Sequence, residues 1–250
     1  MIELRNICKE LHGKQILDNV SLHVERGETL VIVGSSGAGK SVTLKHMIGL
    51  LKPDSGEVLV EGEAVHEAHG TELERIRHKF GVLFQSGALI NWMNVFENVA
   101  LPLFEKTNLS EARVKEIVSE KLALVGLAGA ETKMPAELSA GMKKRAGLAR
   151  AIVRDPAIIL YDEPTSGLDP VLSRSIDRLI NDLKREINAT GVVVTHDLHS
   201  AFQVGDKVAM LHEGKIAQFG TPAEFVQSKH PFVQDFIKAQ FDEKYGRVSA

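Results

Sequence analysis

Short runs of apolar residues, many of them β-branched, recur along the chain between longer stretches whose apolar positions have helical spacing. Such near-continuous runs predict strands covered on both faces, as in a parallel sheet flanked by helices. The predicted strands are residues 28–33, 81–84, 157–161 and 191–195. The predicted helices are residues 40–51, 110–125, 142–153 and 171–187, and Ser110 is in position to cap the second of them. Because strands and helices alternate, the sequence predicts an α/β fold.

Two segments interrupt this α/β core, and a third follows it. Residues 57–62 alternate between polar and apolar side chains, as in a strand at the edge of a hairpin, and residues 86–155 predict a mostly helical insertion. Residues 231–241 place their apolar side chains on one stripe of a helix, which is expected to pack on the core or on a second copy of the chain. The expected organisation is a domain over residues 1–227 and a helical extension over 228–250.

Composition excludes several classes of protein. Of 250 residues, 44% are hydrophobic, which is enough for a buried core and excludes a mainly disordered protein. Thirty basic and 33 acidic residues give a net charge of −3 without long runs of one sign, so a nucleic-acid partner is not expected. The single cysteine, Cys8, cannot form an intrachain disulfide, which fits a reducing compartment.

Neither a signal peptide nor a membrane span is expected. The first residues lack a basic flank followed by an apolar stretch. The longest charge-free run, residues 80–96, is interrupted by glutamine, serine and asparagine, whereas a spanning helix needs about 20 mostly apolar residues. The chain is therefore expected to stay in the compartment where it is made.

Residues 34–41 match the phosphate-loop pattern GxxxxGK[ST], follow a predicted strand and open a predicted helix. Glycines let the backbone approach phosphate oxygens, while the loop N–H groups and the helix N-terminus supply positive potential. Lys40 is expected to reach the terminal phosphates and Ser41 to ligate magnesium. The alternative is a glycine-rich turn that only joins strand to helix. The predicted nucleotide-binding residues of this region are Gly34, Ser35, Gly37, Ala38, Gly39, Lys40, Ser41 and Val42.

Two carboxylates, Asp162 and Glu163, end the apolar strand over residues 157–161. Ligands bind at the carboxyl ends of parallel strands, so Asp162 is expected to hold the magnesium shell and Glu163 to polarise the attacking water. His196 follows another strand and is suited to contact the γ-phosphate or that water. A solvated strand end is the alternative for each. No pair of histidines has a recognisable zinc spacing.

Residues 138–142 read Leu-Ser-Ala-Gly-Met and open the predicted helix that runs to Val153. Here the sequence resembles the ATP-binding-cassette (ABC) family of ATPases, whose signature is Leu-Ser-Gly-Gly-Gln. Over residues 1–225 the other family motifs stand in the expected order: the phosphate loop, Gln85, Asp162 with Glu163, residues 166–169 and His196. The resemblance implies a P-loop NTPase fold with a mostly parallel sheet, an antiparallel β subdomain and an inserted helical subdomain.

The resemblance also implies a homodimer that binds ATP and Mg²⁺ in two composite sites. In each site Ser139 and Gly141 of one copy would face the nucleotide held by the other copy. Asp169 would link the two sites at their interface. The residues implied on the other side of each site are Lys40, Ser41, Gln85, Asp162, Glu163 and His196, of which Ser41, Gln85 and Asp162 would ligate magnesium.

Two positions depart from the family pattern. Ala140 replaces the first signature glycine and adds a methyl group where backbone approaches phosphate. The aromatic residue that stacks on adenine is replaced by His12, whose imidazole can also stack. A histidine on a surface turn is the alternative for His12.

Residues 86–103 contain the single tryptophan, Trp92, with several other large apolar side chains. Such a patch is typical of an interface, here with a membrane permease, while Val95 and Val99 are expected inside the helical lobe. The alternative is that Trp92, Met93 and Phe96 fill the core of the helical insertion.

Within the family, residues 84–89, residues 94–100 and the methionine that ends the signature resemble the ATPases of the Mla system, which moves phospholipid between bacterial membranes. This implies a permease dimer, a periplasmic MCE-type lipid-binding subunit, a small STAS-domain protein and a peripheral position on the cytoplasmic face of the inner membrane. An importer ATPase for amino acids or other small solutes, and an ATPase that signals to a cell-division complex, remain the alternatives.

Overall fold

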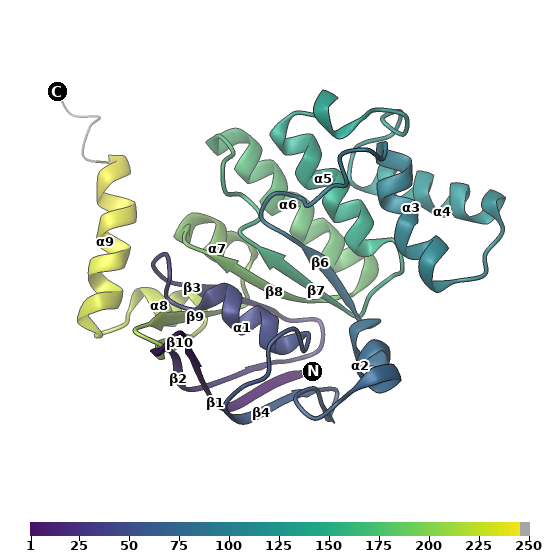
Figure 1. Cartoon of the computed structure of the whole chain (residues 1–250). Helices are drawn as coiled ribbons and strands as arrows, with labels where there is room; N and C mark the ends of the chain where they lie inside the picture. Colours follow the sequence, from purple (N-terminus) through teal and green to yellow (C-terminus); the bar gives the residue numbers. More distant parts are fainter. Residues whose placement is uncertain (246–250) are drawn as a thin grey trace. The chain divides into compact units, whose positions relative to one another are not determined.

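The computed structural model describes residues 1–245, which divide into two compact units. Unit 1 comprises Met1–Arg77 and the residues from Val192 onward, and unit 2 comprises His78–Gly191. Strand β8 (Thr190–Thr195) carries the chain from unit 2 back to unit 1 (Figure 1). Within residues 1–245, every helix is too short or too polar to cross a bilayer.

An antiparallel sheet occupies the first part of unit 1. Its strands, in spatial order, are β2 (Lys14–Val24), β1 (Ile2–Leu11), β4 (Ser55–Val60) and β5 (Glu63–Ala64). Strands β4 and β5 form the expected hairpin, with Leu59 opposite Ala64. The expectation of an edge strand over residues 57–62 is wrong, because β4 also pairs with β1, where Ile2 lies opposite Val60.

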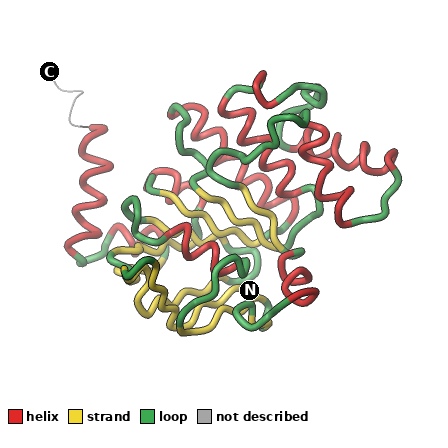
Figure 2. Tube along the Cα trace, viewed as in Figure 1, coloured by secondary structure: helices red, strands yellow, loops and turns green. Residues whose placement is uncertain are grey.

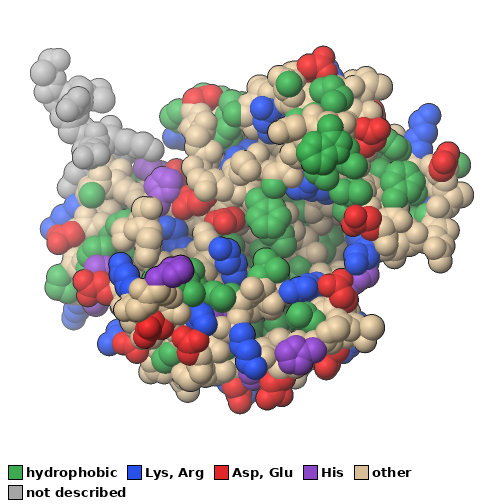
Figure 3. Space-filling view, in the orientation of Figure 1, with side chains coloured by type: hydrophobic (Ala, Val, Ile, Leu, Met, Phe, Trp, Pro, Cys, Tyr) green, Lys and Arg blue, Asp and Glu red, His purple; other side chains and the backbone are tan. Residues whose placement is uncertain are grey.

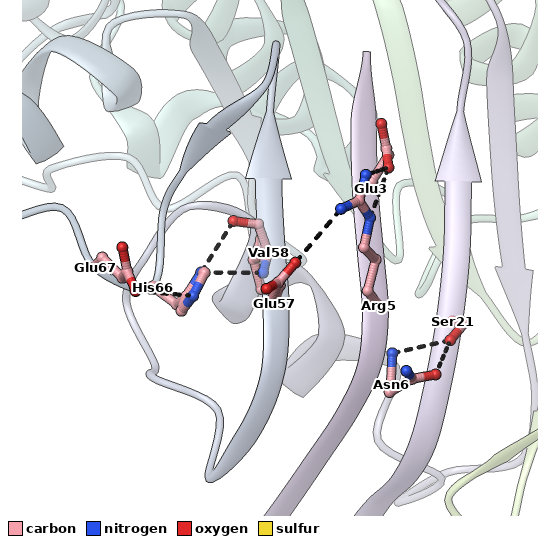
Figure 4. Close-up of polar contacts among 8 residues, drawn as sticks. All are labelled: Glu3, Arg5, Asn6, Ser21, Glu57, Val58, His66 and Glu67. Atoms are coloured by element: carbon pink, nitrogen blue, oxygen red, sulfur yellow. Dashed lines mark hydrogen bonds and ion pairs between the residues drawn. The ribbon is translucent and has the colours of Figure 1, made fainter.

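One face of this sheet is polar. Arg5 on β1 donates to Glu3 at 2.6 Å and to Glu57 on β4 at 3.5 Å, and the backbone N–H of Asn6 donates to the Ser21 hydroxyl on β2 (Figure 4). These side chains are exposed, so the contacts add little to stability. They mark the solvent side of the sheet, whereas alternate apolar residues of β1 and β4 are buried.

The second part of unit 1 contains strands in a parallel arrangement. Strand β3 (Thr29–Val33) pairs in parallel with β9 (Lys207–His212), which pairs in antiparallel fashion with β10 (Lys215–Gly220). Every residue of β3 is buried, as predicted for a strand covered on both faces. The helices of unit 1 are α1 (Lys40–Met47), α2 (Gly70–Arg77), α7 (Leu198–Val204), α8 (Pro222–Val226) and α9 (Pro231–Tyr245). Helix α1 ends before residue 51 because Gly49 adopts a left-handed conformation, with φ of 64°.

Unit 2 is mostly helical (Figure 2). Strand β6 (Phe80–Leu83) pairs in parallel with β7 (Ile158–Asp162). The helices are α3 (Val95–Lys106), α4 (Glu111–Leu124), the 3₁₀ helix η1 (Pro135–Glu137), α5 (Ala140–Ile152) and α6 (Pro170–Ile187). Ser110 caps α4 as predicted, because its hydroxyl accepts from the N–H of Arg113. The fold class is the predicted one: α/β, with a mostly parallel sheet and a separate antiparallel sheet.

Helix α9 contains the predicted helical stripe and packs within unit 1. The Phe232 ring stacks on His212 of β9 at a centroid distance of 3.5 Å, and Phe241 lies 4.5 Å from His199 of α7. Val233 is fully buried. The helix therefore packs on its own chain, the first of the two arrangements expected from the sequence.

Removal of residues 230–250 is expected to lower the melting temperature of the protein. Losing the burial of Phe232, Val233 and Phe241 costs about 4 kcal/mol, since a fully buried large apolar side chain contributes roughly 1.5–3 kcal/mol. At about 2–4 °C per kcal/mol for a chain of this size, the expected shift is about 10 °C by differential scanning fluorimetry. Lys238→Ala, on the exposed side of α9, is the control. An unchanged melting temperature after truncation would show that these contacts do not stabilise the fold.

Candidate nucleotide-binding and hydrolysis site

The phosphate loop joins β3 to α1 in unit 1, and its geometry requires glycine. A Cβ at Gly34 would lie 2.3 Å from the carbonyl oxygen of Leu211, and Gly39 has a φ of 105°. The Lys40 ammonium donates to the carbonyls of Gly34 at 2.8 Å and Ser35 at 3.1 Å, and Lys40 is only 7% exposed. The loop backbone therefore binds the Lys40 ammonium, and the positive charge of this group is buried against the loop.

Helix α1 begins directly at this loop. Its N-cap is Gly39, which provides no side-chain acceptor for the first-turn N–H groups. These groups and the positive end of the helix dipole can serve an anion instead. Ser35 and Gly37 are exposed at the tip of the loop, while Ala38, Ser41 and Val42 are partly exposed. The arrangement fits a polyphosphate chain.

Strand β2 lies against the phosphate loop. A Cβ at Gly39 would be 3.0 Å from the Leu17 side chain and 3.1 Å from the carbonyl oxygen of Ile16. His12 is exposed on the turn that precedes this strand and has a left-handed backbone, with φ of 52°. Both the loop and His12 belong to unit 1, and the adenine-stacking role of His12 stays a prediction.

The two carboxylates follow β7 in unit 2. The first four residues of β7 are buried, whereas Asp162 and Glu163 are partly exposed. Glu163 has a left-handed backbone, with φ of 48°. For a residue other than glycine this conformation costs about 1–3 kcal/mol and persists only where the surroundings enforce it.

Two donors hold the backbone of Glu163 in this conformation. Its carbonyl oxygen accepts from the Ser166 N–H at 3.2 Å and from the Lys144 ammonium at 2.9 Å. The Gln85 side-chain amide in turn donates to the Ser166 hydroxyl at 3.3 Å. The structure thus connects Gln85 to Glu163 through Ser166, the first residue of the motif over residues 166–169.

The signature begins α5, also in unit 2. The Ser139 hydroxyl caps the helix by accepting from the N–H of Met142 at 3.3 Å. Ala140 is exposed in the first turn and does not have a positive φ, so the backbone accepts its methyl group. A Cβ at Gly141 would make ordinary contact with Leu172 at 3.6 Å. The chain's own packing therefore does not require glycine at position 141.

Asp169 and His196, both predicted site residues, also take part in the local structure around them. Asp169 caps α6 in unit 2, where one carboxylate oxygen accepts from the N–H groups of Val171 and Leu172. His196 follows β8 and is exposed. Gln240 of α9 donates to the His196 carbonyl at 2.5 Å and accepts from the Leu198 N–H at 2.8 Å. Helix α9 is therefore bonded to the turn that presents His196.

The sequence motifs do not point to Lys144 or Gln240, whose contacts the structure shows beside Glu163 and His196. Lys144 falls in the buried stripe of α5 with Gly141, Leu148 and Ile152, and a lysine in such a stripe is a signal for a specific partner. No sequence pattern indicates a role for Gln240, because its partners lie more than 40 positions away along the chain.

Comparison with known proteins agrees with these motifs. The model of the ABC transporter family matches residues 17–166, which is more than half of the chain. The chain belongs to the ABC transporter family, and it is an ATPase of that family.

Several relatives resemble the chain along most of its length. The "Probable ribonucleotide transport ATP-binding protein mkl" of Mycobacterium tuberculosis is 46% identical over 239 residues, which cover 96% of this chain and 67% of the relative. The "Intermembrane phospholipid transport system ATP-binding protein MlaF" of Haemophilus influenzae is 40% identical over 242 residues, 97% of this chain and 92% of the relative. The "Methionine import ATP-binding protein MetN" of the same species is 39% identical over 246 residues, covering 96% and 71%.

A solved structure supports the same assignment. It is a dimeric ATP-binding cassette in a post-hydrolysis state, bound to ADP and Pi, with a TM-score of 0.81 and 33% identity. The match covers 89% of this chain and 99% of that cassette. The fold of this chain is therefore that of an ABC cassette.

Proposed function

We propose that this chain is the ATP-hydrolysing subunit of a transporter that moves phospholipid across a bacterial cell envelope, as in the Mla system. The observation that carries the proposal is the 40% identity to MlaF, which extends over 97% of this chain and 92% of that relative. Because almost the whole of both chains is covered, the similarity to MlaF includes unit 2, the mostly helical unit, in which an ABC ATPase can adapt to a particular partner.

The proposed chemistry assigns a role to each motif. The loop amides and Lys40 bind the phosphates of ATP, and Glu163 takes a proton from the attacking water. His196 contacts the γ-phosphate. Ser41, Gln85 and Asp162 are the residues that would hold Mg²⁺. This ion prefers oxygen ligands and is commonly bound by a few protein groups together with substrate phosphates. A loop that excludes any Cβ at Gly34 and holds a buried lysine fits such a ligand.

A second copy of the chain completes the proposed site. Ser139 and Gly141 of that copy contribute helix N-terminal donors to the γ-phosphate, and Asp169 lies at the interface. The dimeric cassette with ADP and Pi supports this arrangement. In the proposed cycle two ATP molecules close the dimer, closure moves the helical units, and hydrolysis resets them.

Trp92 is the proposed anchor for the permease. Its side chain is 79% exposed, whereas Val95 and Val99 of the same segment are buried, as expected from the sequence. The buried Asn98 bonds the backbone of Ile90 in both directions and donates to the carbonyl of Met93, so the loop that carries Trp92 is fixed. In the space-filling view, several hydrophobic side chains are exposed on unit 2 (Figure 3). Tryptophan is enriched among the residues that contribute most to binding at protein interfaces.

The other proposed partners are a periplasmic MCE-type lipid-binding subunit and a small STAS-domain protein. Through the permease, the ATPase would sit on the cytoplasmic face of the inner membrane.

Affinity purification of the full chain from detergent-solubilised native membranes, with mass spectrometry of proteins and lipids, tests this function. The expected result is a permease, an MCE-type subunit and phospholipid. Trp92→Ala is expected to reduce permease recovery at least about 10-fold, since hot-spot truncation costs 2 kcal/mol or more. Val226→Ala, at an exposed apolar position of α8 in unit 1, is the control. Equal recovery with both variants would exclude Trp92 as the anchor.

A small-solute importer is the second candidate, favoured by the 39% identity to the methionine import protein. The same purification distinguishes the two functions. Recovery of a solute receptor, without an MCE-type subunit or phospholipid, would contradict phospholipid transport and support the importer.

A further inference from the structure

We propose that Lys144 is a positioning residue for hydrolysis: it fixes the backbone of Glu163 and couples that residue to the signature at the start of α5. The proposal rests on the proposed function of Glu163 as the general base. Lys144 bonds the backbone carbonyl of Glu163 and would act on hydrolysis through that residue.

The first observation is the burial of a charged side chain. Lys144 is only 4% exposed, and its ammonium donates to the Glu163 carbonyl at 2.9 Å. Burial lowers the pKa of Lys144, while the nearby carboxylates of Glu163 and Asp162 act in the opposite direction. Burying an ammonium group is unfavourable unless a specific partner receives it. Here that partner is the backbone of the predicted catalytic residue.

The second observation is the backbone conformation of Glu163. Its left-handed φ of 48° is unfavourable for a side-chain-bearing residue, and its carbonyl is held by Lys144 and by the Ser166 N–H. If Glu163 left this backbone conformation, the change in φ would redirect its Cα–Cβ bond and, with it, the carboxylate. Loss of the Lys144 donor therefore frees the carboxylate to leave the position that a general base requires, since misplacement by about 1 Å can cost 10²-fold in rate.

The third observation is the position of Lys144 in the fold. It lies on the same helix as Ser139, whose hydroxyl caps α5 at its first turn. A displacement of α5 when the signature engages nucleotide would move the Lys144 ammonium with it. Ser166 gives the same carbonyl a second link, to Gln85. One carbonyl oxygen thus connects the signature helix, the catalytic carboxylate and Gln85.

The test uses the full chain, purified in its native complex, and compares Lys144→Met with Lys143→Met. Methionine keeps the apolar volume and removes the donor, whereas Lys143 is a partly exposed lysine of the same helix. Lys144→Met is expected to lower kcat about 10- to 100-fold, the range for losing a hydrogen bond from a charged group, with the KM for ATP changed less than about 2-fold. Lys144→Gln, which restores a donor, is expected to recover most of kcat.

A double-mutant cycle distinguishes positioning from a purely structural role. In a Glu163→Gln background, adding Lys144→Met is expected to cause no further loss of residual turnover, because Lys144 acts through Glu163. The melting temperature is recorded for every variant. If Lys144→Met does not fold, Lys144→Ala carries the same expectations.

The outcomes separate this inference from the proposed function. Normal turnover of Glu163→Gln overturns the assignment of Glu163 and, with it, the role of Lys144. If Glu163→Gln is inactive but Lys144→Met has the kcat of Lys143→Met, the role of Lys144 is wrong and the function of Glu163 stands. A kcat loss that Lys144→Gln does not recover, or an additive loss in the double mutant, also overturns the role of Lys144.

Discussion

Replacing Glu163 by glutamine is expected to lower kcat for ATP hydrolysis by about 10²–10⁴-fold, the range for losing a general base. The amide has nearly the same shape as the carboxylate but cannot take a proton from the attacking water. ATP affinity is expected to stay within about 2-fold, because the proposed phosphate-binding groups belong to the loop at residues 34–41 and not to this carboxylate. Phosphate release and equilibrium binding of a fluorescent ATP analogue measure the two quantities separately.

The Glu163→Gln protein should also accumulate as an ATP-bound dimer, since hydrolysis is the step that reopens it in the proposed cycle. Size-exclusion chromatography with and without ATP detects this species. Glu105→Gln, at an exposed position of α3, removes one negative charge from the same unit and serves as the control. Glu163→Gln turnover equal to that of the control would contradict the catalytic assignment.

Replacing Lys40 by alanine is expected to raise the Kd for ATP about 100-fold. Lys40 supplies the buried positive charge of the loop, and it holds the loop closed through the carbonyls of Gly34 and Ser35. Charge-assisted hydrogen bonds contribute about 1.5–3 kcal/mol each, and 1.4 kcal/mol corresponds to a tenfold change in Kd. Isothermal titration calorimetry of ATP binding measures the effect.

Lys45→Ala is the matched control for Lys40, because Lys45 is an exposed lysine of the same helix. It is expected to leave ATP binding unchanged. If Lys40→Ala binds ATP as tightly as Lys45→Ala does, the loop at residues 34–41 is not the main phosphate-binding element. The melting temperatures of both variants exclude a folding defect as the cause of weak binding.

The sequence predicted the buried strands well because their signal is local. The strands over residues 29–33 and 158–162 consist almost entirely of buried apolar side chains, so periodicity alone identifies them. The strands β1 and β2 were missed because their alternation is interrupted. Asn6 and Asn19 have left-handed backbones, and the pairing between the two strands shifts register. A bulge moves later side chains to the other face, so no continuous period of two exists to be found.

The residues of the candidate site also differ in whether a local sequence pattern identifies them. The phosphate loop and the strand-end carboxylates are identified by short motifs, because each fold element presents its own functional group. Lys144 and Gln240 act through contacts made only in the folded chain, the first with Glu163, 19 positions away, and the second with the turn at His196, 44 positions away. Sequence periodicity contains no information on such partners. The supporting residues of the site therefore required the structure.

ATP-dependent movement of phospholipid is the measurement that tests the proposed function most directly. The complex purified with this chain would be placed in vesicles that contain a fluorescent phospholipid, and transfer to acceptor vesicles or a lipid-binding subunit would be followed after ATP addition. The account predicts transfer that requires ATP and is abolished by Glu163→Gln. ATP turnover that is stimulated by a small solute, without any ATP-dependent movement of lipid, would contradict it.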